Sequence, residues 1–185
     1  MRKQWSLKPH DVVVAMELTV QPGTSSYTEL AHLLGLSAGE THKAVQRCVE
    51  AGLLVRVKQG RGPLGEVYTP VLPAVQELLL HGVRYVFPAI RGATTRGVPT
   101  AHAAPPLREH LMASDALPPV WPDPTGRVRG EALVPLYPGA PGAAAREPRL
   151  YACLTLIDAL RIGRARERAL AGKLLAEELR RDDAT

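Results

Sequence analysis

The sequence predicts a mainly α-helical protein with one small β-hairpin. Apolar residues recur at helical spacing through residues 26–54, and two alternating stretches then flank a glycine-rich segment. Twelve of the 17 prolines fall within residues 88–148, which disfavours regular helix there. The expected organisation is a helical unit with the hairpin over residues 7–82, an ordered loop-rich segment over 83–148, and a long helix over 149–181.

Three helices are predicted before the hairpin from apolar spacing and from the residues at their ends. Pro9 suits the first turn of the first helix, whose apolar stripe comprises Val12, Val13, Met16 and Leu18. Gly35 supplies the left-handed residue that ends the second helix. Ser37 and Glu40 have the spacing of a capping box, so the third helix begins there, and Gly52 closes it.

The third helix has one apolar side and one side without apolar residues. The apolar side carries Thr41, Ala44, Val45 and Cys48. The other side carries Gly39, His42, Lys43 and Gln46, with Arg47 at its edge. A capped helix that presents small, hydrogen-bonding and cationic side chains is suited to entering a DNA major groove.

The hairpin follows this helix directly. Residues 54–58 alternate as a strand does, residues 59–65 form a glycine-rich tip, and residues 66–69 supply the return strand. Its cationic side chains are Arg56, Lys58 and Arg61.

Four short motifs in this region carry a family resemblance. They are Glu29-Leu30-Ala31, Leu34-Gly35-Leu36-Ser37, Ala44-Val45 and Ala51-Gly52-Leu53. With the hairpin behind them, residues 7–70 resemble the winged helix-turn-helix domain of bacterial transcriptional regulators such as the MarR family. The resemblance implies a winged helix-turn-helix followed by the loop-rich segment and the long C-terminal helix, and it implies binding to double-stranded DNA.

The sequence therefore predicts a DNA-binding transcriptional regulator, a repressor or autoregulator that reads an operator. His42, Lys43 and Gln46 are expected to reach base edges. Gly39 or Thr41 would allow close approach of the backbone, and Ser37 with the amides behind it would bind a phosphate. The expected phosphate or minor-groove contacts from the hairpin are those of Arg56, Lys58 and Arg61, and Arg47 borders the interface.

The rest of the chain is predicted from weaker signals. Residues 71–82 are expected to form a helix that stops at Gly82, residues 83–87 a short strand, and residues 105–113 a short helix. The apolar stripe of residues 149–181 comprises Leu150, Leu154, Ile157 and Leu160 at its start. A single helix of that length would exceed a small domain, so we expect it to form a homodimer or to bind a partner protein.

Other classes of site find little support. Six histidines and two cysteines lack the spacing of a metal site, and no phosphate loop or catalytic constellation is present, so neither a cofactor nor an enzyme is expected. The cysteines, Cys48 and Cys153, are expected to be buried thiols. No signal peptide or membrane-spanning stretch is found, so we expect a cytoplasmic protein without a membrane partner.

Two alternatives remain open. The C-terminal half bears a general resemblance to regulators encoded beside nucleotidyltransferase-type toxins, which implies an antitoxin-like or adaptor protein whose C-terminal half binds a partner. The second alternative is an enzyme or a ligand sensor that uses the loop-rich middle segment. A cluster of cations, Arg161, Arg164, Arg166 and Arg168, is either a phosphate contact or a solvated helix face.

Overall fold

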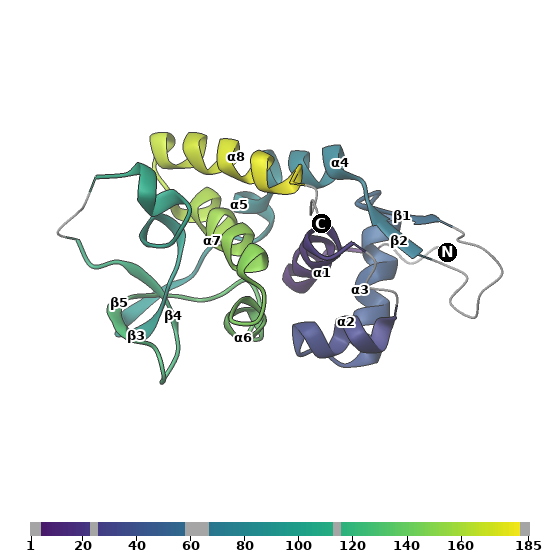
Figure 1. Ribbon diagram of the computed structural model, residues 1–185, viewed down its shortest axis with the longest axis horizontal. Coiled ribbons are helices and arrows are strands. Elements are labelled where there is room, and N and C mark those ends of the chain that lie inside the picture. Colours follow the sequence, from purple (N-terminus) through teal and green to yellow (C-terminus); the bar gives the residue numbers. More distant parts are fainter. Residues whose placement is uncertain (1–4, 23–25, 58–66, 113–115, 182–185) are drawn as a thin grey trace. The chain divides into compact units, whose positions relative to one another are not determined.

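The computed structural model describes residues 5–22, 26–57, 67–112 and 116–181. The chain forms two compact units, Met1–Gln76 (unit 1) and Glu77–Thr185 (unit 2). Helices dominate both, and each unit also contains a small sheet (Figure 1). The protein is therefore a mixed α/β chain, with one sheet more than the sequence predicts.

Unit 1 contains the three predicted helices and the predicted hairpin. In chain order its elements are α1 (Pro9–Val20), α2 (Tyr27–Leu34), α3 (Ala38–Glu50), β1 (Leu54–Val57), β2 (Val67–Pro70) and all but the last residue of α4 (Leu72–Glu77). Helix α1 packs against both α2 and α3. The core consists mainly of aliphatic side chains: Val12, Val13, Met16, Leu30, Leu34, Ala44, Val45 and Leu54.

The ends of α2 and α3 lie at the residues that the sequence indicates. Gly35 ends α2 in the left-handed region, at a φ of 65°. Ser37 caps α3 and forms the predicted capping box with Glu40. Gly52 follows α3 at a φ of 74° and turns the chain into β1. These predictions are confirmed, because each depends on the conformational preference of one or two residues.

Strands β1 and β2 form the two-stranded antiparallel hairpin. Leu54 pairs with Pro70 at one end and Val57 pairs with Val67 at the other. Of the three hairpin cations, Arg56 lies on β1, whereas Lys58 and Arg61 lie outside the described residues.

The helical segment after the hairpin continues past Gly82. Helix α4 passes into a π-helical turn, η1 (Leu78–Gly82), and then into α5 (Val83–Val86). The N–H of Val83 donates to the carbonyl of Leu78, which closes the wide turn and carries the chain past the glycine. The predicted helix stop at Gly82 and the predicted strand over residues 83–87 are therefore wrong.

Unit 2 contains a sheet that the sequence does not predict. Its strands are β3 (Arg91–Pro99), β4 (Pro119–Pro122) and β5 (Val128–Leu133). Strand β3 pairs antiparallel with β4 and with β5, while β4 and β5 pair in parallel, so the sheet closes on itself. The strands approach each other so closely that two positions have room only for glycine. A Cβ atom would lie 2.0 Å from the Trp121 carbonyl oxygen at Gly97, and 2.0 Å from that of Pro118 at Gly130.

Two short helical turns lie between β3 and β4, and a third lies between β5 and the C-terminal helices. They are η2 (Ala101–Ala103), η3 (Leu107–His110) and α6 (Ala140–Ala144). The predicted short helix over residues 105–113 is thus present only as the single 3-10 turn η3. The segment is ordered over its described residues, and its buried side chains include Leu107, Trp121 and Leu133.

The predicted long C-terminal helix is two helices, α7 (Pro148–Ile162) and α8 (Ala165–Leu179), which pack on each other. Gly163 ends α7 with extended backbone angles, and a Cβ atom there would lie 2.4 Å from the Ala159 carbonyl oxygen. Arg164 caps α8, and its backbone N–H donates to the Glu167 carboxylate at 2.8 Å. The prediction of one continuous helix is wrong because Gly163 reverses the chain.

The turn at Gly163 also explains how the apolar stripe of α7 is buried. Leu150, Leu154, Ile157 and Leu160 are all buried within this one chain. Helix α7 has packing contacts with α5, α6 and α8. The surface that the sequence assigns to a homodimer or to a partner protein is therefore already covered.

A buried carboxylate joins α7 to the sheet of unit 2. Asp158 is 1% exposed and accepts hydrogen bonds from the Thr100 hydroxyl at 2.7 Å and from the Trp121 indole N–H at 2.6 Å. The Arg161 guanidinium donates to the same carboxyl group at 2.6 Å. Burial raises the pKa of Asp158, and Arg161 and the hydrogen bonds oppose this shift.

Candidate nucleic-acid interface

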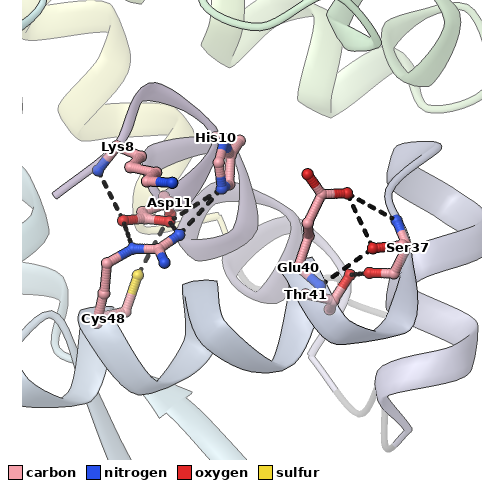
Figure 2. Close-up of polar contacts among 8 residues, drawn as sticks. Lys8, His10, Asp11, Ser37, Glu40, Thr41 and Cys48 are labelled. Carbon is pink, nitrogen blue, oxygen red and sulfur yellow. Dashed lines mark hydrogen bonds and ion pairs between the residues drawn. The ribbon is translucent and has the colours of Figure 1, made fainter.

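The first turn of α3 is held by a reciprocal capping box. The Glu40 N–H donates to the Ser37 hydroxyl oxygen at 3.2 Å, and the Ser37 hydroxyl donates to the Glu40 carboxylate at 2.9 Å (Figure 2). The Ser37 backbone N–H donates to the same carboxylate at 3.3 Å, and the two bonds that Ser37 donates lower the pKa of Glu40. The Ser37 hydroxyl thus caps α3. The Glu40 carboxylate already lies beside the backbone amides that the sequence analysis expects to bind phosphate.

The outward side of α3 carries four of the predicted site residues. Gly39, His42 and Lys43 are exposed, and Gln46 is half-buried. A Cβ atom added at Gly39 would meet nothing within 4 Å, so the backbone there is open to an approaching molecule. The structure therefore groups these residues on one accessible face of one rigid helix.

His42 is supported by an aromatic pair that the sequence pattern does not reveal. The Tyr27 ring lies edge-on to the His42 ring, with 5.0 Å between their centroids. The Tyr27 hydroxyl donates to that of Tyr68 at 2.7 Å, which links α2 to β2. Tyr27, His42 and Tyr68 are far apart in the sequence and come together only in the folded protein. The sequence therefore shows the two tyrosines but not their contact with His42.

Two predicted site residues do not belong to the outward face. Thr41 is fully buried, and its hydroxyl donates to the Ser37 carbonyl oxygen at 3.0 Å. Its side chain therefore belongs to the buried side of α3. Arg47 is only 4% exposed. Its Nε atom donates to Asp11 at 2.6 Å, and a second nitrogen donates to the other carboxylate oxygen at 2.5 Å. Both assignments to the interface are corrected on this evidence.

Asp11 is the centre of the network that holds Arg47. It is fully buried on α1, and its carboxylate also accepts the Lys8 N–H at 2.8 Å (Figure 2). The Cys48 thiol donates to the Asp11 carbonyl oxygen at 3.3 Å, and the His10 Nε2 atom lies 3.0 Å from the Arg47 guanidinium. The network clamps α3 against α1, and so it fixes which face of α3 is turned outward.

Burial sets the protonation behaviour of two groups in this network. It lowers the pKa of His10, and the neighbouring Asp11 carboxylate opposes that shift. It raises the pKa of the Cys48 thiol, which is free and buried, as predicted. Cys153 is likewise free and buried, and burial raises the pKa of its thiol to about 12. Neither thiol is in a state to act as a nucleophile.

Arg56 is the described cation of the hairpin. It is exposed on β1 and lies opposite Tyr68 of β2 in the strand register. Tyr68 is in turn bonded to Tyr27, which touches His42. The hairpin and the outward face of α3 are therefore connected through three aromatic rings.

Other kinds of site find no support in the same part of the chain. Among the described residues, no three His, Cys, Asp or Glu side chains gather closely enough to hold a metal ion. No described helix combines the length and apolar character needed to span a membrane. Comparison with protein-family models, with curated proteins and with solved structures finds no match to this chain.

Proposed function

We propose that this protein binds double-stranded DNA sequence-specifically through α3 and acts as a transcriptional regulator. The observation that carries the proposal is the accessible face formed by Gly39, His42, Lys43 and Gln46 on a capped helix that α1 clamps in place. A B-DNA major groove admits an α-helix, and its base edges are read by side chains that donate and accept hydrogen bonds.

Each residue of this face has a distinct role in the proposal. Gln46 can bond the two hydrogen-bonding positions of adenine, and Lys43 donates to acceptors on guanine or to phosphate. Tyr27 orients the His42 ring toward the same surface. The absence of a side chain at Gly39 lets the helix backbone approach the groove edge.

The hairpin supplies the sequence-independent part of binding. Arg56 is the described candidate for a phosphate contact, and Lys58 and Arg61, which lie outside the described residues, remain predictions of the same kind. Contacts to phosphate set register and affinity, whereas contacts to bases set the sequence that is bound.

The experiment starts from the duplex that full-length protein selects from a random-sequence pool, with affinity measured by fluorescence anisotropy. Lys43→Ala is expected to weaken binding, and Gln46→Ala to cost about 1–3 kcal/mol and to relax one base position. Lys173→Ala is the matched control, because it removes the same charge from an exposed position of unit 2. Equal affinity of the Lys43→Ala/Gln46→Ala double variant and the wild type would refute the assignment.

Gly39→Leu separates the shape of the face from its charge. A Cβ atom at this position meets nothing within 4 Å, and leucine favours helix over glycine, so the fold should keep its stability. The added bulk should lower DNA affinity by about tenfold or more, because it holds the helix away from the groove. Unchanged affinity would mean that the backbone at Gly39 does not face DNA.

A further inference from the structure

Unit 2 contains a cleft of about 750 Å³ that the proposed DNA interface does not involve. Its walls come from β3, the η2–η3 segment, the start of β4, β5 and the turn between α7 and α8. This volume lies in the range of about 300–1,000 Å³ that is typical of small-molecule sites.

One wall of the cleft is apolar. Leu111, Met112, Leu117, Val128 and Ile162 contribute to it. Met112 and Leu117 are 95% and 55% exposed, which leaves large apolar side chains in contact with water. An apolar ligand body that covers them would remove this surface from water.

The polar groups of the cleft leave an excess of positive charge. The lining contains three arginines, Arg91, Arg108 and Arg164, and two glutamates, Glu131 and Glu167. Glu131 is already paired with Arg91 at 2.5 Å, and Glu167 accepts the Arg164 backbone N–H at 2.8 Å. Among the described residues, the guanidinium groups of Arg108 and Arg164 form no ion pair, so both are available to an anion.

His102, one of the residues of the lining, contains a buried polar atom. Its Nδ1 atom is buried and makes no hydrogen bond to any described residue. A buried polar atom without a partner is unfavourable, and native proteins retain few of them. Because this atom is inaccessible to solvent, it adds no contact for a ligand in the cleft.

The turn at Gly163 explains how these groups come together. Within the predicted cation cluster, Arg161 is bonded to Asp158, and Arg168 donates to the Gly163 carbonyl oxygen. Of the four arginines in this cluster, only Arg164 lines the cleft, just before α8.

We propose that this cleft binds a small organic anion: an apolar ring or chain that bears one carboxylate, sulfonate or phosphate group. The apolar body would lie against Leu117 and Val128, and the anionic group would bond to Arg108 and Arg164. This proposal does not depend on DNA binding by unit 1, and either one can fail without the other.

The test compares two fluorescent probes on the full-length protein. One is 8-anilinonaphthalene-1-sulfonate, and the other is N-phenyl-1-naphthylamine, which has the same aromatic body without the sulfonate. Wild-type protein should bind the sulfonate probe saturably at one site. Arg108→Gln/Arg164→Gln should weaken that probe by about tenfold or more and change the neutral probe by less than about twofold, because only the charge-assisted bonds are lost.

Arg166→Gln is the matched control, since Arg166 is exposed in the same first turn of α8 and does not line the cleft. The proposal is overturned if the sulfonate probe does not bind saturably, if Arg166→Gln weakens it equally, or if both probes lose affinity together in the double arginine variant.

A second variant decides the matter if circular dichroism shows that the arginine variant is unfolded. Leu117→Glu alters an exposed side chain, so it preserves the core, but it places a negative charge on the apolar wall. It should weaken both probes by about tenfold or more, since the apolar body can no longer be covered. Undiminished binding of both probes to Leu117→Glu would overturn the proposal.

Discussion

Replacing Arg47 with alanine is expected to destabilise unit 1 by about 3–5 kcal/mol, because it leaves the buried Asp11 carboxylate without its cationic partner. The change removes two charge-assisted hydrogen bonds, of 2.6 and 2.5 Å. Hydrogen bonds to charged groups contribute about 1.5–3 kcal/mol each, so the two bonds alone account for a loss of this size. The Lys8 N–H is too small a compensation for a carboxylate that water cannot reach.

A double-mutant cycle isolates the interaction. Asp11→Ala should cost a similar amount, plus about 1 kcal/mol for the lost hydrogen bond to the Lys8 N–H at the start of α1. The double variant should be no less stable than Asp11→Ala alone, so the coupling between the two residues should be about as large as the cost of Arg47→Ala, about 3–5 kcal/mol. Arg56→Ala is the control, because Arg56 is an exposed arginine of the same unit and its loss should cost less than about 1 kcal/mol.

Urea unfolding monitored by far-UV circular dichroism measures these differences, and hydrogen exchange of α1 and α3 assigns them to unit 1. The reasoning fails if Arg47→Ala unfolds at the same urea concentration as Arg56→Ala. It fails equally if the main effect of Arg47→Ala is a DNA-binding salt slope flattened by about one unit, since that would place Arg47 on a phosphate.

Two further predictions concern unit 2 and pH. Gly130→Ala should destabilise unit 2 by about 3 kcal/mol, because the new Cβ would lie 2.0 Å from the Pro118 carbonyl oxygen, whereas Gly142→Ala, with its nearest atom at 3.9 Å, should be neutral or stabilising. Trp121 fluorescence during urea unfolding tests this, and equal midpoints would refute it. Because burial lowers the pKa of His10 below 6.5, the unfolded chain binds more protons just below that pH, and stability should fall as the pH drops through this window. Melting temperatures from pH 5 to pH 8 should lose this dependence in His10→Gln but keep it in His81→Gln, and a matching dependence in both variants would contradict it.

The parts of the fold predicted from sequence are those determined by neighbouring residues. Gly35, the Ser37–Glu40 capping box and the alternation of β1 each act within one turn or one strand, so their signals survive without tertiary context. The sheet of unit 2 has no such signal. Its strands pair residues as distant as Arg91 and Leu133, and prolines interrupt the pattern at their ends.

The same distinction between local and tertiary signals applies to the residues of the candidate site. Helical spacing correctly places Gly39, His42 and Lys43 outward, because the apolar side of α3 is unambiguous. Arg47 lies between the two faces, and spacing alone cannot tell whether such an arginine meets water or a buried acid. The outcome depends on Asp11, which is 36 residues away in the chain.

Both units depend on an acidic residue that sequence patterns would assign to the surface. Asp11 lies in α1, where Asp11 to Leu18 are all buried, and Asp158 lies in α7, where Cys153 to Leu160 are all buried. A helix that is buried on every side cannot leave a carboxylate in water, so the acid must find donors inside the protein. In each unit at least one of those donors comes from another element: Arg47 of α3 for Asp11, and Trp121 of β4 for Asp158. Because each carboxylate has donors at specific positions, it selects one packing of its helix among several that apolar contacts alone would allow, and in unit 1 that packing is the one that turns His42 and Lys43 outward.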